Sequence, residues 1–462
     1  MTEMNKAKAL ELATRVVDYI EKDALTDADK KSIHDESIDN FNENVNPGWL
    51  EYRKSVSTDS AFVEWTDSEE HFEDLNGTQF IDCLGGFGIY TCGHRNPAIL
   101  KTVKAQLDRY ALHSQELVDP LRGYLAKCLA MITPGDLQYC FFTNGGAEAV
   151  EMSLKLARLA TGGRWYISTV GAFHGKSMGA ISMGGKGAYR EDYTPMIQQV
   201  QHVEYGNAEA LEAAIKNLHT VGEKVAGVIL EPIQGEAGVI IPPAGYLKKV
   251  REICDTYGVA MIADEIQTGM GRTGSMFRCE AEDVVPDIMT YGKAFGGGIM
   301  PITGIIARPW TYEKSGAGTN CEGKMFENPW ILGSPTFGGN PLACSAAIST
   351  IKYMLENDIP KVCQEKGDYI MAGLEKLKNK YPTVLKEYRG AGLLIAMEFP
   401  EAEVGYAVTK GLFARNVMTA GTLVNAKTVR IEPPAVLKYE TIDSVLAKLE
   451  ESIADAKAEF KL

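Results

Sequence analysis

Three short apolar runs in the middle of the chain have the length and composition of buried β-strands. They cover residues 225–230, 259–263 and 287–291. Strands of a parallel sheet that is covered by helices on both faces are apolar almost without interruption, whereas half-buried strands alternate apolar and polar residues. Segments with helical spacing separate the runs. We therefore expect a large, doubly wound, mostly parallel α/β sheet at the centre of the protein.

The N-terminal part of the chain shows a different pattern. Residues 6–22 and 27–42 carry apolar residues at mixed spacings of three and four, which predicts two amphipathic helices. Residues 62–65 and 79–84 are predicted to form a small hairpin, with the Asn-Gly pair at 76–77 as its turn.

From residue 342 onward, helices and strands follow one another without regular alternation. Helices around 342–379 and 440–460, with a strand at 394–399, predict a smaller α+β domain. We therefore expect three parts: an N-terminal helical and hairpin segment that packs with the small domain (residues 1–75), a large domain (76–341) and the small C-terminal domain (342–462).

Two of the central strands end in residues that can carry chemistry. Asp264 follows the run 259–263 directly, and Lys293 follows the run 287–291 after one glycine. Open α/β sheets bind their ligands at the carboxyl ends of the strands, so we expect both side chains at the same edge. Burial lowers the pKa of a lysine and frees its lone pair to attack a carbonyl. The pair alone also fits a solvated lysine and a helix-capping aspartate.

A glycine-rich turn precedes these strands in the chain. A predicted strand at 138–142 runs into Asn144, Gly145 and Gly146, and a helix then continues to about residue 160. The first N–H groups of a helix are unpaired and lie at the positive end of its dipole, so such a turn can bind a phosphate group. A plain strand-to-helix turn is an equally good interpretation of this stretch.

A second glycine-rich stretch surrounds an aromatic residue. Gly85, Gly86 and Gly88 flank Phe87. Glycines in this arrangement allow the backbone to approach a ligand or a neighbouring chain closely, and they also suit a simple turn.

Composition narrows the class of protein. The chain has 462 residues, of which 45% are hydrophobic and 23% are charged, as in soluble globular proteins. Its net charge of −14 argues against nucleic-acid or anionic-membrane partners. No uncharged apolar run approaches the roughly 20 residues that span a bilayer. Nine cysteines without a C-x-x-C pair, together with a polar start of the chain, predict free thiols and a cytoplasmic protein.

The segment 171–177 resembles two other catalytic motifs and matches neither. A Walker A loop needs four residues between its glycines, but three separate Gly171 from Gly175. A nucleophilic Ser177 should follow its strand directly, and here several residues intervene. The last histidine is His219, so the C-terminal half offers none for a Ser–His pair or a metal site. We therefore expect neither a hydrolase, nor a kinase, nor a bound metal.

Taken together, the motifs resemble the class-III (ω-amino) family of pyridoxal-phosphate-dependent aminotransferases of fold type I. The resemblance covers nearly the whole chain after about residue 30, and it rests jointly on residues 144–148, 231–232, 264–269, 292–294, 336–341 and 430–434. Within the family, the segments 46–53, 113–117 and 421–427 are most similar to members that use putrescine.

The resemblance implies the residues that bind pyridoxal 5′-phosphate. Lys293 holds the cofactor through its amine nitrogen and moves a proton during the reaction. Asp264 bonds the pyridinium nitrogen and Gln267 the 3-oxygen of the ring. Phe173 stacks on the ring, and backbone groups at the glycine-rich turn bind the phosphate. A threonine of the partner subunit, in a homodimer or higher oligomer, also reaches the phosphate. The remaining expected cofactor-binding residues are therefore Phe173, His174, Gly145, Gly146, Ala147 and Thr336.

The chain departs from the family at two of these positions. The family commonly has Ser and Thr where this chain has Gly145 and Ala147. The missing hydroxyl groups leave the phosphate more dependent on backbone N–H groups, which bears on cofactor affinity.

The resemblance also implies a set of substrate-binding residues. Arg430 binds a carboxylate of 2-oxoglutarate, and Glu236 pairs with Arg430 when the substrate has no carboxylate. Phe87 replaces a tyrosine that helps ornithine aminotransferase to hold the α-carboxylate of ornithine, which favours a donor without that group. Gln115 and Glu116 are expected either to meet the distal ammonium of a diamine or to be ordinary polar residues beside a helix.

The expected activity is transfer of the terminal amino group of putrescine, or of a related diamine such as cadaverine, to 2-oxoglutarate in two alternating half-reactions. The products are glutamate and 4-aminobutanal, as expected in polyamine catabolism. Ornithine or 4-aminobutyrate as donor, an internal aminomutase, and a cofactor-binding protein without activity are the alternatives.

Overall fold

The computed structural model of the protein describes residues 3–51, 62–197, 199–313 and 324–462. The pattern of contacts divides the chain into two compact units. One comprises residues 1–67 and 71–80, and the other comprises residues 68–70 and 81–462. The boundaries predicted near residues 75 and 341 stay predictions. Tyr52 and Arg53, at the end of one segment that carries the family resemblance, lie outside the described residues.

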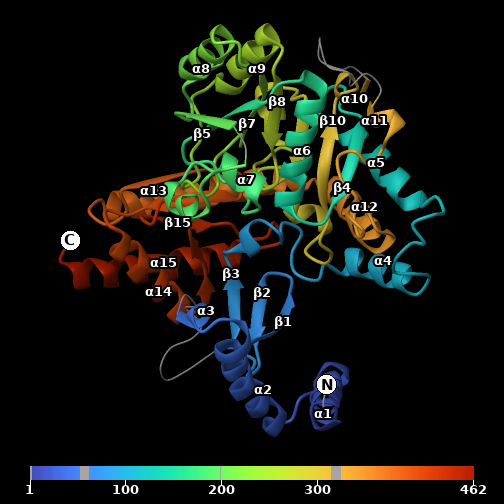
Figure 1. Ribbon diagram of the computed structural model, residues 1–462. Helices are drawn as coiled ribbons and strands as arrows, with labels where there is room; N and C mark the ends of the chain where they lie inside the picture. The colour runs from blue at the N-terminus through green and yellow to red at the C-terminus, as the bar shows by residue number, and fades with distance from the viewer. Residues whose placement is uncertain (1–2, 52–61, 198, 314–323) are drawn as a thin grey trace. The chain divides into compact units, whose positions relative to one another are not determined.

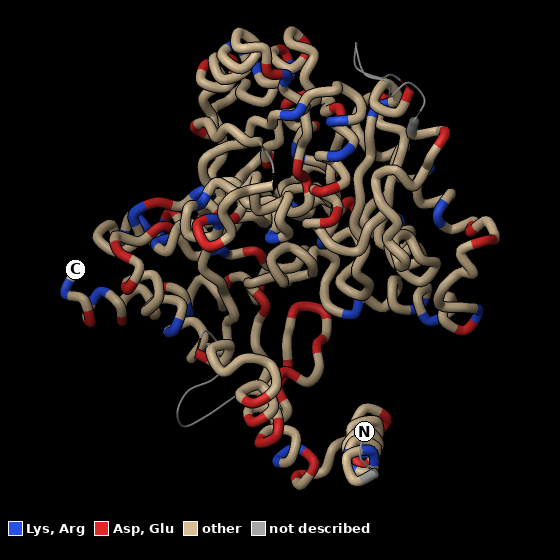
Figure 2. Tube along the Cα trace, viewed as in Figure 1, with Lys and Arg blue, Asp and Glu red and all other residues tan. Residues whose placement is uncertain are grey.

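The first unit begins with the two predicted helices (Figure 1), α1 (Glu3–Glu21) and α2 (Asp27–Asn40). The prediction of an amphipathic α2 was wrong, since none of its residues is buried. Acidic residues are spread around this helix (Figure 2), so it has no apolar stripe that could pack against a core. A reciprocal pair of hydrogen bonds between Thr26 and Asp29 caps its first turn.

The predicted hairpin was incomplete. Three strands, β1 (Glu64–Ser68), β2 (His71–Asp74) and β3 (Gln79–Asp82), are neighbours in one sheet. The Asn-Gly turn therefore joins β2 to β3, and a short connection after Ser68 joins β1 to β2. Within the second unit, the last residues of β3 pair in parallel with β13 (Val417–Met418).

The second unit contains the large sheet expected from the apolar runs. Its seven strands have the order β4-β10-β9-β8-β7-β5-β6, in which β10 alone is antiparallel to its neighbours. The fold is therefore the predicted mixed α/β fold with a large, mostly parallel sheet. The strands are β4 (Tyr139–Thr143), β5 (Trp165–Thr169), β6 (Gln199–Val203), β7 (Val225–Leu230), β8 (Ala260–Asp264), β9 (Ile288–Tyr291) and β10 (Thr303–Ala307).

Helices cover the two faces of this sheet (Figure 1). The helix α6 (Gly146–Thr161) packs on one face, and α8 (Ala208–Thr220) and α9 (Tyr246–Tyr257) pack on the other. Successive residues of β8 alternate between the two cores: Ile262 lies in the core under α6, whereas Met261 lies in the core under α8 and α9. This two-sided burial explains why the strand is apolar without alternation.

A further helical layer and a smaller sheet complete the second unit. The helices α4 (Pro97–Leu107) and α5 (Pro120–Ile132) pack against α12 (Pro341–Glu356). The smaller sheet is antiparallel, with the order β11-β12-β15-β14. Its strands and helices are β11 (Glu387–Ala391), β12 (Leu394–Glu398), β14 (Ala420–Gly421), β15 (Thr428–Ile431), α13 (Ile359–Lys380), α14 (Ala402–Ala414) and α15 (Tyr439–Phe460).

Short elements fill the connections between these parts. They are α3 (Gly48–Glu51), α7 (Met178–Met183), α10 (Trp310–Glu313), α11 (Lys324–Glu327), a π-helical turn (Phe41–Val45) and 3₁₀ turns that include η2 (Gly85–Phe87) and η6 (Lys293–Gly296). Within the described ranges, every helix is too short or too polar to span a lipid bilayer.

Candidate active site

A cavity of about 260 Å³ lies at the carboxyl ends of the central strands of the large sheet. The sequence-predicted residues that line it are Gly146, Ala147, Phe173, His174, Asp264, Gln267 and Lys293. It is also lined by Gly175, Glu231, Ile233, Ile266, Thr268 and Thr303. The structure thus brings an acid, an amine, an aromatic ring and a helix N-terminus to one cavity, as expected from the strand ends.

Asp264 is the last residue of β8, and its carboxylate is held by three donors. His174 Nδ1 lies 2.7 Å from Oδ2, while Thr290 Oγ1 donates to Oδ1 at 2.8 Å and the Ile266 N–H donates at 3.2 Å. The aspartate is 5% exposed. Because a buried carboxylate is stable only when it is hydrogen-bonded, this set of donors holds the side chain in one orientation.

His174 responds to the carboxylate beside it. Burial by itself lowers the pKa of this imidazole, but the hydrogen bond and the charge of Asp264 outweigh burial and raise it. Its second nitrogen, Nε2, is buried without a hydrogen-bond partner among the described residues. The hydrogen bond therefore ties the imidazole to the Asp264 carboxylate in the wall of the cavity.

Lys293 begins the 3₁₀ turn η6 one glycine after β9, with a positive φ of 48°. Its amine forms no hydrogen bond with any described residue. Burial lowers the pKa of Lys293, while Glu432, Glu236 and Asp264 act in the opposite direction. The balance favours a neutral, nucleophilic amine more than at an exposed lysine.

The N-terminus of α6 forms another wall of the cavity. Glu148 Oε2 accepts the N–H groups of Asn144 at 2.8 Å and Gly145 at 3.2 Å. The N–H groups of Gly146 and Ala147 have no hydrogen-bond partner among the described residues. Two unpaired donors at the positive end of a helix are suited to a phosphate group.

The Gln267 amide is held by hydrogen bonds at its nitrogen and by close packing at its oxygen. Its Nε2 donates to both oxygens of Glu432, at 3.1 and 3.2 Å, and to the Phe87 carbonyl at 3.4 Å. A Cβ atom on Gly235 would lie 1.9 Å from Gln267 Oε1, so only glycine at that position leaves room for the amide.

Arg430 and Glu236 form a buried ion pair. Arg430 Nη1 donates to Glu236 Oε1 at 2.8 Å, and the two side chains are 2% and 7% exposed. The second oxygen of Glu236 accepts the Leu423 N–H at 2.9 Å. The guanidinium lies 5.1 Å above the Phe87 ring. These contacts compensate the charge of the guanidinium. Arg430, Glu236 and Phe87 do not themselves line the cavity of 260 Å³.

The other predicted residues lie away from this cavity. Gln115, Glu116 and Thr336 are exposed and do not line it. Gln115 Nε2 donates to the Thr336 carbonyl at 2.9 Å, so the structure brings these two residues together. Gly145 is the N-cap of α6 and does not line the cavity. The roles expected for these residues stay predictions.

Two acidic residues at the site had no role in the sequence analysis. Glu231 accepts the Phe173 N–H at 2.9 Å and the Gly235 N–H at 3.0 Å. Burial raises its pKa to about 7. Glu231 follows β7 directly, just as Asp264 ends β8, so the strand-end rule could have identified it. Glu432 lies two residues beyond Arg430, on the same face of an extended segment.

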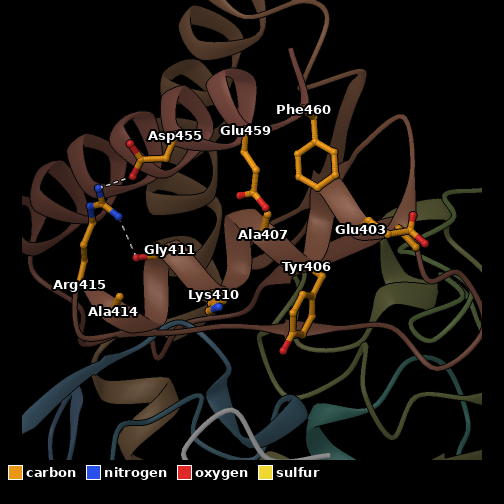
Figure 3. Close-up of a pocket in the computed structure, with 11 residues that line it drawn as sticks. Glu403, Tyr406, Ala407, Lys410, Gly411, Ala414, Arg415, Asp455, Glu459 and Phe460 are labelled. Atoms are coloured by element: carbon orange, nitrogen blue, oxygen red, sulfur yellow. Dashed lines mark hydrogen bonds and ion pairs between the residues drawn. The ribbon is translucent and has the colours of Figure 1, made fainter. Parts of the chain in front are cut away.

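A second hollow, of about 630 Å³, lies between α14 and α15. Figure 3 shows Arg415 there in contact with Asp455, at 2.6 Å, and with the Gly411 carbonyl at 3.1 Å. None of the residues that the sequence analysis proposed for the active site lines this hollow. Within the described part of the chain, no group of His, Cys, Asp and Glu has the arrangement of a metal site.

Comparison with known proteins agrees with this geometry. Residues 56–453 match the family model described as Aminotransferase class-III. An ornithine aminotransferase from Toxoplasma gondii is 26% identical over 93% of this chain and 96% of its own, with a TM-score of 0.81. A taurine:2-oxoglutarate aminotransferase from Bifidobacterium kashiwanohense is 25% identical over 92% and 98%, with a TM-score of 0.80. An acetylornithine aminotransferase from Elizabethkingia anophelis is 26% identical over 85% and 94%, with a TM-score of 0.71.

Proposed function

The chain belongs to the class-III aminotransferase family, and we propose that it transfers the terminal amino group of putrescine, or of a related diamine, to 2-oxoglutarate. The buried pair between Arg430 and Glu236 is the observation that carries the choice of substrates. A diamine has no carboxylate for Arg430 to bind, so Glu236 compensates the guanidinium in that half-reaction. The keto acid brings a carboxylate that can replace Glu236.

Pyridoxal 5′-phosphate is the cofactor. The residues of the cavity fit it: Lys293 offers a free amine, Asp264 offers a fixed negative charge, and the start of α6 offers two unpaired N–H donors. When bound, the cofactor supplies an aldehyde that accepts the amino group and a ring that stabilises negative charge on the substrate carbon.

The protein's own residues hold the reactants and move the proton. We propose that the Lys293 amine takes a proton from the carbon that bears the donor's amino group. It would then deliver this proton to the cofactor carbon that receives the amino group. Its lowered pKa supports this role, because a base must be neutral to accept a proton. Asp264, held in place by His174, would contact the ring nitrogen of the bound cofactor.

We propose that Glu236 switches the site between the amine donor and the keto acid. The Leu423 N–H binds its Oε2, and the Leu423 carbonyl is in turn held by Lys186 Nζ at 2.6 Å and Tyr189 Oη at 2.9 Å. This anchoring supports a short movement in which Oε1 leaves Arg430 while Oε2 keeps its donor. Arg430 is then free for a two-pronged contact with the keto acid.

The charge around the amine supports a cationic donor. Among the charged groups that act most strongly on Lys293, the carboxylates of Glu432, Glu236 and Asp264 favour the protonated amine and the guanidinium of Arg430 opposes it. A surplus of negative charge attracts an amine that carries a second ammonium group. Phe87 has no hydroxyl for an α-carboxylate, which weakens the case for ornithine as donor.

We propose a homodimer in which each subunit supplies Thr336 to the site of the other, with Gln115 and Glu116 beside it as contacts for the amine donor. Support comes from the exposure of all three residues and from the neighbouring Leu117 and Val118, which are 79% and 94% exposed. Apolar residues this exposed are typical of a surface that another chain covers.

A panel of amine donors tests the substrate. Putrescine should give a higher kcat/KM than ornithine or 4-aminobutyrate, and turnover should require 2-oxoglutarate. The likeness to an ornithine aminotransferase makes ornithine the main competing donor. A higher kcat/KM with ornithine would assign the chain to that activity, and turnover without a keto acid would indicate an aminomutase.

A further inference from the structure

We infer that Glu432 is a positioning residue of this active site: its carboxylate fixes the orientation of the Gln267 amide and places a negative charge beside the Lys293 amine. The inference rests on the proposed function for its purpose, but its geometry and its test do not depend on any substrate.

Glu432 is buried next to the cavity without lining it. The residue is 1% exposed and follows β15, the strand that carries Arg430. Its main-chain N–H donates to the Cys83 carbonyl at 2.9 Å, which fixes the backbone from which the side chain extends. A buried carboxylate needs hydrogen-bond donors, and the donor that the structure provides to both of its oxygens is Gln267 Nε2.

This contact determines which end of the Gln267 amide faces which way. The NH₂ group can donate to a carboxylate, whereas the amide oxygen would be repelled by it. Gln267 therefore points Nε2 at Glu432 and Oε1 at Gly235, and it cannot flip without placing two acceptors against each other. The second hydrogen of the NH₂ group is directed to the Phe87 carbonyl at 3.4 Å.

The same carboxylate lies close to Lys293. A Cβ atom on Gly88, which has a φ of 98°, would lie 2.9 Å from Glu432 Oε1 and 3.5 Å from Lys293 Cδ. The two side chains thus border the same small space, which only a glycine leaves open. Of the charged groups that act on the amine, Glu432 makes the largest contribution, ahead of Glu236, Arg430 and Asp264.

The charge has a chemical consequence. Burial drives Lys293 towards the neutral amine, and a nearby carboxylate opposes burial. Glu432 thereby sets how much of the amine is protonated at a given pH. Asp264 pairs with His174 and Glu236 pairs with Arg430, whereas the hydrogen-bond donor to the Glu432 carboxylate is the Gln267 amide. The buried Arg272 guanidinium donates to the carbonyl of Pro433, the next residue along the chain.

The test measures the charge state of Lys293 in the full chain freed of cofactor. Trace acetylation with acetic anhydride over a series of pH values, followed by mass spectrometry of the peptide that contains Lys293, gives the midpoint at which the amine becomes reactive. Glu432→Gln removes the charge at constant size, and the exposed Glu403→Gln on α14 is the matched control. Lys427 in the same digest serves as an internal standard.

In Glu432→Gln, the midpoint for Lys293 should fall by about one pH unit or more, as expected on removal of an opposite charge at this range. Glu403→Gln should leave it unchanged. An unchanged midpoint in Glu432→Gln would overturn the inference. Since no substrate or cofactor is involved, the two proposals can fail separately. A protein that does not use putrescine could still show the shifted midpoint, and a protein that uses putrescine could show an unchanged midpoint.

If Glu432→Gln does not fold, as judged by circular dichroism, a crystal structure of the unmodified holoenzyme decides. Gln267 Nε2 within hydrogen-bond distance of Glu432 supports the inference. A carboxylate turned away from both Gln267 and Lys293 overturns it.

Discussion

Arg430 Nη1 and Glu236 Oε1 lie 2.8 Å apart in a nearly fully buried pair, although 194 positions separate the two residues in the chain. In the proposed function, Glu236 covers Arg430 while an amine without a carboxylate is bound, and it withdraws from Arg430 when a keto acid binds.

Glu236→Gln should affect the two half-reactions differently. The neutral side chain leaves the guanidinium uncompensated, so kcat/KM for putrescine should fall by about tenfold or more, whereas the value for 2-oxoglutarate should not fall. Stopped-flow measurement of each half-reaction separates the two values. Glu403→Gln, on the remote hollow between α14 and α15, is the control. Equal losses in both half-reactions would contradict the switching role.

Gly145→Ser should strengthen cofactor binding. A Cβ atom at this position meets no atom within 4 Å, and the backbone φ of −129° suits any residue. The added hydroxyl can donate to the phosphate, and such a charge-assisted hydrogen bond should lower the Kd by about tenfold. Gly145→Ala adds the carbon without the donor and should leave the Kd unchanged. Fluorescence titration of the cofactor-free protein gives both values, and equal affinities for the two variants would refute the prediction.

Glu231→Gln should remove a pH dependence of stability. Burial raises the pKa of this carboxyl from an ordinary value of 4.5 to about 7, so folding favours its protonated form. As pH rises from 4.5 to 7, the unmodified protein should therefore lose about 3 kcal/mol of unfolding free energy relative to the variant. Urea unfolding across this range measures the difference.

Glu403→Gln changes an exposed carboxyl and should keep the pH profile of the unmodified protein. Parallel profiles for Glu231→Gln and the unmodified protein would show that the Glu231 carboxyl is not held in its protonated form by the fold.

Mixed dimers test whether Thr336 acts on the partner subunit's site. Chains with Lys293→Ala alone lack the amine, and chains with Thr336→Asp alone should repel the phosphate. In a mixed dimer with a shared site, the Thr336→Asp chain contributes an intact Lys293 and receives an intact Thr336 from the other chain. Co-expression should therefore restore part of the activity. No recovery, with mixed dimers demonstrated by mass spectrometry, would place Thr336 in its own subunit's site or outside both.

Much of the fold and the cofactor end of the site could be predicted from local patterns. Met261 and Ile262 face opposite cores, so the run around them had to be apolar on both faces, and that signal identifies a central strand. The carboxyl ends of parallel strands lie at the same edge of a sheet. The positions of Asp264 and Lys293 after two such strands therefore predicted that both side chains would meet at one cavity, which both of them line.

What escaped prediction depends on contacts between distant residues or on weak local signals. Gln267 and Glu432 are 165 positions apart, and nothing in the local sequence around Glu432 indicates a hydrogen bond to that amide. β2 was missed because its four residues, His71 to Asp74, are mostly polar and lack a clear alternation. The role proposed for Thr336 involves a partner subunit, so the local sequence of one chain could not indicate it.

The most direct test of the central claim, that the Lys293 cavity moves an amino group from a diamine to a keto acid, is the absorbance spectrum of the holoenzyme. Putrescine added without a keto acid should convert the bound cofactor to its pyridoxamine form, and 2-oxoglutarate added afterwards should restore the original spectrum. In Lys293→Ala neither change should occur at a comparable rate. A spectrum of the unmodified holoenzyme that does not respond to putrescine would contradict the account.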